Sequence, residues 1–284
     1  MKTAIVGASG ALGRAVFERL SVEDAQQAFV LTSRFPEQLV WAKGSKRVEV
    51  RKLDLEDPMH AAAVLRDCDR VVFCPILTLS GPTARSLRQL DCHAHLVLFS
   101  SNNVGIDFES DVYAALRAEE DRVLGMGGGK LSAVRPCMIY GDIADGNVGR
   151  LIGLARKLRI LPMMGSGAAR QQPVHYDDLA RLVARLFEDQ TAEQLAIAAG
   201  GPDVLSMTQM YRTVQSIVPG PVFIITIPGS LLRLLITFFG TLMNLSNAQV
   251  RRSETDRLPT WPLLPSWTPI VSFDQGVRRI VEKR

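Results

Sequence analysis

Three glycines near the N-terminus constrain this chain more than any other feature. Gly7, Gly10 and Gly13 stand three residues apart in the stretch GASGALG, after an apolar run at residues 4–6 and before an amphipathic stretch. Such glycines allow a tight turn, close approach of backbone N–H groups to a pyrophosphate at a helix start, and close packing of that helix on the strand. The first gap is one residue longer than in the common dinucleotide fingerprint. We interpret the stretch as a phosphate-binding turn, because it joins a predicted strand to a predicted helix.

Apolar strand-like runs alternate with helical patterns through the first half of the chain. Strands that are apolar throughout and are joined by helices indicate a parallel sheet covered on both faces. We therefore predict an α/β protein with a doubly wound parallel sheet and a smaller C-terminal lobe. The predicted strands read KTAIVG, AFVLTS, VEVRKL, RVVFCPI, HLVLFS and LSAVRP, and helices are predicted over about residues 12–20, from Pro58, from Pro82 and through Tyr113.

The alternation changes after Tyr140, where a Gly-rich loop, GSGAARQQPVHYDD, precedes a predicted helix and a further core strand. Toward the C-terminus the chain becomes richer in proline. We predict that residues 1–140 and 174–200 form a nucleotide-binding core. Residues 141–173 and 201–284 are predicted to form a smaller lobe interleaved with this core, and the family resemblance given below implies that this lobe binds the substrate.

The end of the second predicted strand bears on the choice of cofactor. It reads Thr32-Ser33-Arg34, with no acidic residue before Glu37. A site that selects NAD commonly has a carboxylate here for the ribose 2′-hydroxyl, whereas an arginine accommodates the 2′-phosphate of NADP. We therefore expect NADP rather than NAD, with Arg14 as a second source of positive charge. The alternative for Arg34 is an ordinary solvated loop charge.

Asp54 follows the third predicted strand, in the stretch KLDLED. A carboxylate at this strand end is suited to accept a hydrogen bond from the adenine amino group of a dinucleotide. It is equally suited to cap a turn or the start of a helix. Both interpretations of Asp54 stay open at the level of sequence.

The composition argues against several other classes of protein. The net charge is +4 and Lys and Arg form no dense run, so no nucleic-acid partner is indicated. The four cysteines have no paired spacing, and the apolar run before Gly7 is too short for a secretory segment, so we expect a cytoplasmic protein with free thiols. His93 and His95 lack further ligands for a metal site. The acidic run at residues 119–121 is expected to be a solvated helix face.

Residues 222–243, VFIITIPGSLLRLLITFFGTLM, approach the length of a membrane span and contain one charge, Arg233. Pro228 and Gly229 divide them into a strand-like and a helix-like part, which argues against a span. We favour a buried or lid helix over residues 229–243. Contact of this helix with a membrane surface is the alternative.

Several further stretches follow the glycines in a fixed order: LDLED, LVLFSSNNVG, a Tyr on the next predicted helix, VRPCMIYGD and QPVHYDDLARLV. With GASGALG they resemble the short-chain dehydrogenase/reductase superfamily, specifically its extended or atypical branch of NAD(P)-dependent epimerases and dehydratases. The resemblance runs from Gly7 to about Ala199 and continues more loosely in GGPDVLSMTQM and PIVSFDQGVRRI. It implies a Rossmann-type core, a nicotinamide cofactor, and a substrate cleft between core and C-terminal lobe.

The resemblance also implies catalytic roles. In that family a Ser or Thr polarises the substrate oxygen, a Tyr exchanges a proton with it, and a Lys four residues later holds the ribose and favours the phenolate. The matching Tyr is Tyr113, and the matching Ser is Ser101, with Ser100 or Asn102 as alternatives because the segment is one residue short. Arg117 stands at the lysine position, and a planar guanidinium is not a conservative replacement there.

By the same resemblance, Pro136 and the backbone of Met138 line the nicotinamide end of the cofactor. No metal ligand is expected. The complete set of predicted cofactor-binding residues is Gly7, Ser9, Gly10, Ala11, Leu12, Gly13, Arg14, Arg34, Asp54, Leu55, Pro136 and Met138.

Two functions fit these residues. The first is an NADP-dependent oxidoreductase or epimerase that acts on a hydroxyl or carbonyl substrate. The apolar character of residues 231–243 suggests that this substrate is itself apolar. The second is a catalytically silent NAD(P)-binding redox sensor or an assembly or accessory protein. The Ser–Tyr pair favours the first and Arg117 favours the second. No motif names the substrate, and a homodimer is compatible with helices packed on a sheet face.

Overall fold

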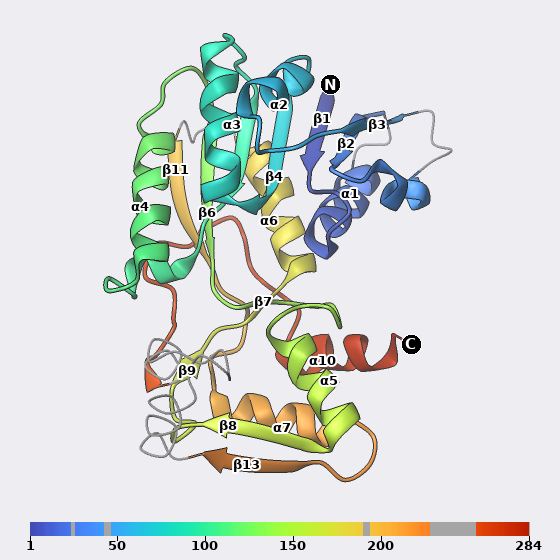
Figure 1. The fold of residues 1–284 in the computed structure, drawn as a ribbon, viewed down its shortest axis with the longest axis vertical. Coiled ribbons are helices and arrows are strands. Elements are labelled where there is room, and N and C mark those ends of the chain that lie inside the picture. The colour runs from blue at the N-terminus through green and yellow to red at the C-terminus, as the bar shows by residue number, and fades with distance from the viewer. Residues whose placement is uncertain (24–25, 43–46, 190–193, 228–253, 284) are drawn as a thin grey trace. The chain divides into compact units, whose positions relative to one another are not determined.

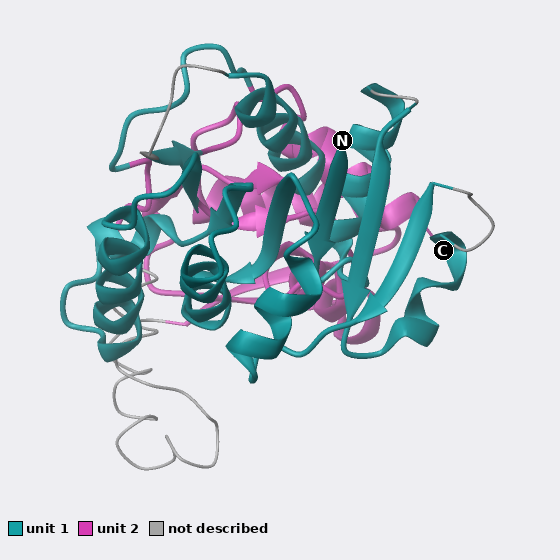
Figure 2. Ribbon diagram, turned by 90° about the horizontal axis from the view of Figure 1, so that it is seen from above, with its two compact units in different colours: residues 1–136, 176–199, 260–268 teal, residues 137–175, 200–259, 269–284 magenta. Residues whose placement is uncertain are grey.

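The computed structural model describes residues 1–23, 26–42, 47–189, 194–227 and 254–283. The chain forms two compact units, which are coloured separately in Figure 2. Unit 1 comprises Met1–Pro136, Tyr176–Ala199 and Thr260–Thr268, and unit 2 comprises Cys137–His175, Gly200–Pro259 and Pro269–Arg284.

The helix predicted over residues 229–243 lies outside the described residues. The expectations that depend on it, an apolar substrate and contact with a membrane surface, therefore stay predictions. Within the part of the chain that the structure describes, no helix combines the length and the apolar character needed to cross a membrane.

A seven-stranded parallel sheet forms the centre of unit 1 (Figure 1). Its strands are β1 (Lys2–Val6), β2 (Ala28–Ser33), β3 (Val48–Lys52), β4 (Arg70–Ile76), β5 (His95–Phe99), β6 (Leu131–Pro136) and β11 (Gln194–Ala199). They lie in the order β11-β6-β5-β4-β1-β2-β3, and every neighbouring pair is parallel. The order reverses between β1 and β4, which is the arrangement of a doubly wound Rossmann-type sheet. The predicted fold class is confirmed.

Helices cover both faces of this sheet. They are α1 (Ala11–Glu23), α2 (Pro58–Leu65), α3 (Leu77–Gln89), α4 (Asp111–Leu124) and α6 (Tyr176–Glu188), with short 3-10 helices η1 (Pro36–Ala42) and η2 (Asn102–Gly105). α1 packs against α6, while α2, α3 and α4 follow one another along the opposite face. Because both faces are covered, the central strands are buried throughout, as their apolar runs predict.

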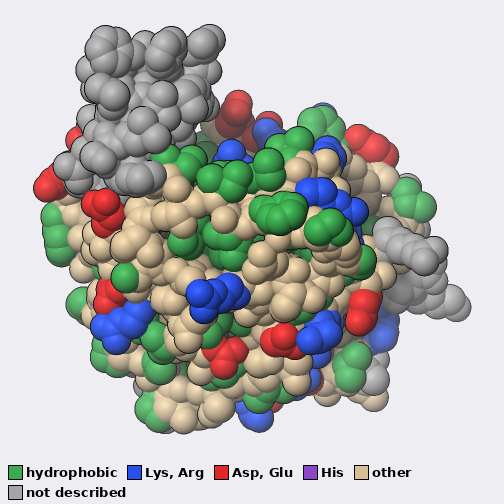
Figure 3. Space-filling view, turned by 90° about the horizontal axis from the view of Figure 1, so that it is seen from below, with side chains coloured by type: hydrophobic (Ala, Val, Ile, Leu, Met, Phe, Trp, Pro, Cys, Tyr) green, Lys and Arg blue, Asp and Glu red, His purple; other side chains and the backbone are tan. Residues whose placement is uncertain are grey.

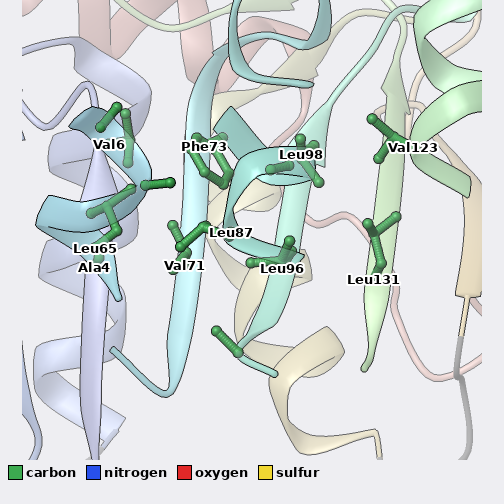
Figure 4. Close-up of a cluster of buried hydrophobic side chains, with 14 of the residues drawn as sticks. Ala4, Val6, Leu65, Val71, Phe73, Leu87, Leu96, Leu98, Val123 and Leu131 are labelled. Atoms are coloured by element: carbon green, nitrogen blue, oxygen red, sulfur yellow. The ribbon is translucent and has the colours of Figure 1, made fainter. Parts of the chain in front are cut away.

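The core between the sheet and α2, α3 and α4 is shown in Figure 4. Alternate strand residues point to the same face, so Val6 of β1 and Phe73 of β4 meet Leu65 and Leu87 of the helices there. All four side chains are at most 2% exposed. This packing holds the carboxyl ends of β1 and β4 rigidly at the point where the strand order reverses.

Unit 2 is built from short strand pairs and three described helices. Its elements are β7 (Ile139–Tyr140), α5 (Val148–Leu158), β8 (Ile160–Met164), β9 (Arg170–Gln171), β10 (Val174–His175), β12 (Leu205–Ser206), α7 (Met207–Ile217), β13 (Phe223–Ile227) and α10 (Phe273–Glu282). The strands pair as β7 with β10, β9 with β12, and β8 with β13. Ser206 and Ser272 begin α7 and α10 with capping boxes. α5, α7 and α10 share a second apolar core.

The segment Thr260–Thr268 belongs to unit 1, although the predicted boundaries assign it to the substrate lobe. The indole N–H of Trp267 donates to the carbonyl oxygen of Asp178 at 3.1 Å. The backbone N–H of Ala198 donates to the carbonyl oxygen of Pro262 at 3.0 Å. Because these attachments are to residues far away in the sequence, the local pattern of the segment carries no sign of them.

Two members of the acidic run on α4 are buried, so the expectation of a solvated face is wrong for them. Glu119 is 6% exposed and Glu120 is 1% exposed. The guanidinium of Arg135 donates to Glu120 Oε1, with Nε at 2.8 Å. Arg85 and Arg122 donate to Glu119, the latter at 3.1 Å. Charged residues are buried in this way when an opposite charge lies beside them. Here Arg85 of α3 and Arg135 of β6 supply that charge.

Candidate functional site

The glycine turn meets three separate geometric requirements. Gly7 has a φ of +78°, a conformation that side chains rarely allow. A Cβ added to Gly13 would lie 2.4 Å from the carbonyl oxygen of Gly7 and 2.8 Å from the Cα of Ala8, so α1 can approach β1 only where residue 13 has no side chain. A Cβ on Gly10 would meet only the Gly7 oxygen, at 3.5 Å, and Gly10 is exposed. The space beside Gly10 is therefore open to a ligand.

These contacts predict opposite results for two substitutions of the same kind. Gly13→Ala is expected to lower the free energy of unfolding by about 2 kcal/mol, because its Cβ meets backbone atoms that cannot turn away. Gly10→Ala is expected to keep the stability but to weaken the binding of a nicotinamide dinucleotide, NADPH or NADH, at least tenfold, about 1.4 kcal/mol, because its Cβ occupies the open side of the turn.

Thermal unfolding and a fluorescence titration with NADPH separate the two effects. Gly153→Ala in α5 is the matched control, since nothing lies within 4 Å of its added Cβ. This control is expected to raise the stability by about 0.5–1 kcal/mol. Equal stability of Gly13→Ala and Gly153→Ala would contradict the proposed role of Gly13.

A cavity of about 630 Å³ lies at the carboxyl ends of β1, β2, β3 and β4. This size is typical of a site for a small ligand or part of a cofactor. Its lining includes five predicted cofactor-binding residues: Gly7, Ser9, Arg34, Asp54 and Leu55. It also includes residues that the sequence analysis missed, among them Phe35, Gln38, Thr78, Leu79 and Pro82. They belong to turns and helix starts without a motif of their own, so only their proximity in space reveals them.

The remaining predicted cofactor-binding residues are not part of this lining. They are Gly10, Ala11, Leu12, Gly13, Arg14, Pro136 and Met138. Arg14 Nε donates to Glu18 Oε1 at 2.8 Å, and its guanidinium lies 5.1 Å from the centre of the Trp41 ring. Pro136 is the last residue of β6, and Met138 belongs to unit 2.

The end of β2 offers polar groups that fit a dinucleotide. The hydroxyl of Thr32 is buried, and among the described residues it has no hydrogen-bond partner. The hydroxyl of Ser33 donates to Ser9 Oγ at 3.2 Å, which ties the strand end to the glycine turn. Arg34 is exposed, and its guanidinium lies 5.8 Å from the centre of the Phe35 ring. A buried orphan hydroxyl beside an exposed cation is a fitting environment for a polar, anionic ligand.

The acidic side of the cavity is formed after β3. Asp54 and Glu56 both belong to the lining. Asp54 Oδ1 accepts a hydrogen bond from the backbone N–H of Glu56 at 3.1 Å. Asp54 is therefore both a turn-forming acid and a cavity residue, which is consistent with each interpretation left open from the sequence.

Ser101 and Tyr113 are connected through Asn103. The side-chain amide of Asn103 donates to Tyr113 Oη at 2.7 Å, and its backbone N–H donates to Ser101 Oγ at 3.2 Å. Ser101 caps η2 through this second bond. Asn103 stands in the stretch LVLFSSNNVG, but only the pairing of η2 with α4 identifies its side chain as part of the site.

The two alternatives for Ser101 are buried and engaged elsewhere. The hydroxyl of Ser100 donates to a carboxylate oxygen of Glu120. Asn102 Oδ1 accepts from the backbone N–H of Thr260 at 3.0 Å. Ser101 is partly exposed, so its hydroxyl is the accessible one of the three.

Arg117 is bonded to the loop that follows η2. Its Nη1 donates to the carbonyl oxygen of Val104 at 2.8 Å and to that of Asp107 at 3.2 Å. The guanidinium also lies 4.8 Å from the centre of the Phe108 ring. The positive charge at the lysine position therefore holds the loop at residues 104–108.

The cysteines supply no nucleophile to this site. All four are free thiols. Burial raises the pKa of Cys74 and of Cys137 to about 12, so both are protonated near neutral pH. Among the described residues, no group of three or more His, Cys, Asp or Glu is arranged to hold a metal ion.

Comparisons with known proteins bear on this arrangement. Residues 7–104 match a family model described as NAD(P)H-binding. No curated protein matches the sequence.

Solved structures are similar over almost the whole chain. UDP-glucuronic acid 4-epimerase from Bacillus cereus, in complex with UDP-glucuronic acid and NAD, is 14% identical, with 98% of this chain and 96% of that chain covered and a TM-score of 0.70. dTDP-glucose 4,6-dehydratase from Bacillus anthracis, in complex with NAD, is 11% identical, with 99% and 96% covered and a TM-score of 0.73. UDP-glucose 4-epimerase from Thermus thermophilus, also with NAD, is 15% identical, with 99% and 98% covered and a TM-score of 0.70.

At these identities the likeness concerns the fold, while the family model concerns the glycine turn and the strands around the cavity. The two findings agree with the motifs and with the sheet order. The chain thus matches the NAD(P)H-binding family model over residues 7–104 and has the fold of the epimerase and dehydratase structures named above, which agrees with the resemblance of its motifs.

Proposed function

We propose that the protein is an NADP(H)-dependent oxidoreductase or epimerase that acts on a hydroxyl or carbonyl group of a small molecule. The observation that carries the proposal is the set of groups around the cavity at the β1–β4 switch point. Arg34 stands on its rim, and neither Thr32 nor Ser33 at the end of β2 is acidic. A guanidinium can pair with a 2′-phosphate, whereas NAD selection would call for a carboxylate here.

The side chains that would carry the chemistry come from η2 and α4. A bound nicotinamide supplies or accepts the hydride. Tyr113 would hold the transferred proton at Oη, and the amide of Asn103 would orient that phenol. Ser101 accepts a hydrogen bond from a backbone N–H, so its own O–H is left to donate to a substrate oxygen.

A second candidate function is supported by the hydrogen bonds of Arg117. Its guanidinium is held by the carbonyl oxygens of Val104 and Asp107. A lysine at this position in the family would hold the ribose of the cofactor. Arg117 does not hold the ribose while its guanidinium is hydrogen-bonded to the loop at residues 104–108. The protein would then bind the cofactor without turnover, as a redox sensor or accessory protein.

The cofactor preference is tested by fluorescence titration of the nucleotide-free protein with NADPH and NADH. The wild type is expected to bind NADPH at least tenfold more tightly, about 1.4 kcal/mol. Arg34→Gln is expected to remove this preference by weakening NADPH alone, because NADH has no 2′-phosphate to lose. Arg19→Gln is the control, since Arg19 is a cation of α1 that pairs with Glu23 and does not line the cavity.

Equal affinities for the two cofactors in the wild type would refute the proposed role of Arg34. Failure to bind either cofactor would refute both candidate functions. For the reaction itself, the purified protein and NADPH are incubated with a panel of aldehydes, ketones and quinones, and oxidation is followed by absorbance. Turnover of any member supports the oxidoreductase. An epimerase returns its cofactor unchanged, so it is tested with NADP⁺ and UDP-sugars of the kind bound by a similar structure, with the sugars separated by chromatography. Tight NADPH binding with no reaction in either assay supports the second candidate.

A further inference from the structure

The parallel pair β8 and β13 in unit 2 consists of apolar residues apart from Thr226, which stands on the face opposite to Phe223 and Ile225. Its register sets Phe223 beside Ile160 and Ile225 beside Pro162. The residues between them turn inward, and Leu161 is fully buried in the core of unit 2. Alternation along a strand therefore places Phe223 and Ile225 on the outer face.

The outer face is apolar and partly exposed. We call it the ribbon face, and its residues are Ile160, Pro162, Met164, Phe223, Ile225 and Ile227. Phe223 is 63% exposed, Ile225 is 47% exposed and Ile160 is 37% exposed. A contiguous exposed apolar surface of this kind marks a site of interaction, whereas single exposed apolar residues need no explanation.

The two stretches of sequence that contain the strands of the ribbon face carry basic residues and no acidic residue. No Asp or Glu occurs in the sequence between Asp145 and Asp177, or between Asp203 and Glu254. These stretches contain α5, β8, α7 and β13. The basic residues on their described parts are Arg150, Arg156, Lys157, Arg159, Arg170 and Arg212. Arg170 is paired with Asp256, which lies outside these stretches, at 2.7 Å.

Cations lie directly beside the apolar residues. Lys157 and Arg159 are exposed and stand within three residues of Ile160. Arg159 is fixed there by donating to the carbonyl oxygen of Pro219. Figure 3 views the side on which β8 and β13 lie in Figure 1, and it shows hydrophobic side chains together with Lys and Arg side chains and with Asp and Glu side chains.

We propose that the ribbon face binds the surface of an anionic lipid bilayer. Exposed aromatic and aliphatic side chains can enter the boundary of headgroups and acyl chains, to a depth of about 5–10 Å, while the cations beside them attract the headgroups. A second copy of this chain is a poorer occupant, because a symmetric pair would set the same basic residues against one another. The residues after Ile227 form no part of the proposed face.

Co-sedimentation of the full chain with vesicles tests this surface. We expect binding to vesicles of phosphatidylcholine mixed with phosphatidylglycerol and no binding to phosphatidylcholine alone. Added NaCl should weaken the binding, since it screens the cations. Lys157→Gln should weaken it about fivefold, the contribution of one basic residue near an anionic surface, whereas Lys52→Gln in unit 1 should leave it unchanged.

The apolar part is tested with Phe223→Thr combined with Ile225→Thr, because threonine keeps the preference for a strand. We expect this double variant to bind at least tenfold more weakly, with a cooperative thermal unfolding that shows it is folded. Ile270→Thr is the matched control, since Ile270 is 62% exposed but lies outside the ribbon face.

Unchanged binding of the double variant, or no binding of the wild type to anionic vesicles, would overturn the proposal. So would a dimer in solution that the double variant abolishes while vesicles are not bound.

Discussion

Tyr113→Phe is expected to lower the rate of NADPH oxidation with a carbonyl substrate by about 10²–10⁴-fold, the usual contribution of a positioned acid or base. Phenylalanine keeps the ring and removes Oη, which Asn103 holds at 2.7 Å. The affinity for NADPH should change far less than the rate. The measurement is the initial rate with the substrate that the carbonyl panel identifies, together with a fluorescence titration of the variant.

Tyr211→Phe is the matched control for this prediction. The Tyr211 hydroxyl donates to the carbonyl oxygen of Pro162 within unit 2 and belongs to no part of the site. We expect this variant to keep the wild-type rate. A Tyr113→Phe protein with the wild-type rate would exclude Tyr113 as the acid or base. If neither protein turns over a substrate, and Tyr113→Phe supports the cellular role as well as the wild type does, the silent binding protein is the better description.

Glu120→Gln is expected to lower the free energy of unfolding by about 3–5 kcal/mol, because it leaves a buried guanidinium without its counter-charge. The side chains of Glu120 and Arg135 are 1% and 11% exposed. Arg135 also lies 4.1 Å from the centre of the Trp261 ring, so it has little freedom to reach water. Equilibrium unfolding in urea measures the change.

Two further variants make this prediction specific. Glu188→Gln breaks the exposed pair with Arg185 and should cost about 0.5 kcal/mol or less. Adding Arg135→Met to Glu120→Gln removes the unpaired charge and should recover part of the lost stability. A loss below about 1 kcal/mol for Glu120→Gln alone would mean that Arg135 reaches another partner or solvent.

The parallel sheet and the glycine turn could be predicted from the sequence because their signals are local. A strand buried on both faces must be apolar at nearly every position, as in the run at residues 4–6. The requirement at Gly13 is equally local, since the backbone atoms that exclude a side chain are those of Gly7 and Ala8. Where partners stand within a few residues of one another, the pattern along the chain already contains the constraint.

The arrangement around Tyr113 was decided only by the tertiary structure. The stretch LVLFSSNNVG contains Asn103 but gives its side chain no role, and Asn103 reaches the phenol because η2 and α4 pack together. Arg117 matches the lysine position by its spacing from Tyr113. The position of its guanidinium, however, is determined by hydrogen bonds to the carbonyl oxygens of Val104 and Asp107.

The same distinction explains the buried acids and the segment near the C-terminus. Glu120 belongs to a run of acids that would be solvated on an isolated helix, and it is buried because β6 supplies Arg135. Thr260 joins unit 1 through Asn102, a residue distant in the sequence. Hydrophobic periodicity and glycine geometry can be predicted from the order of residues alone. The pairing of charges and hydrogen-bonding groups depends on which distant elements the fold brings into contact, because these interactions act only over a few ångströms.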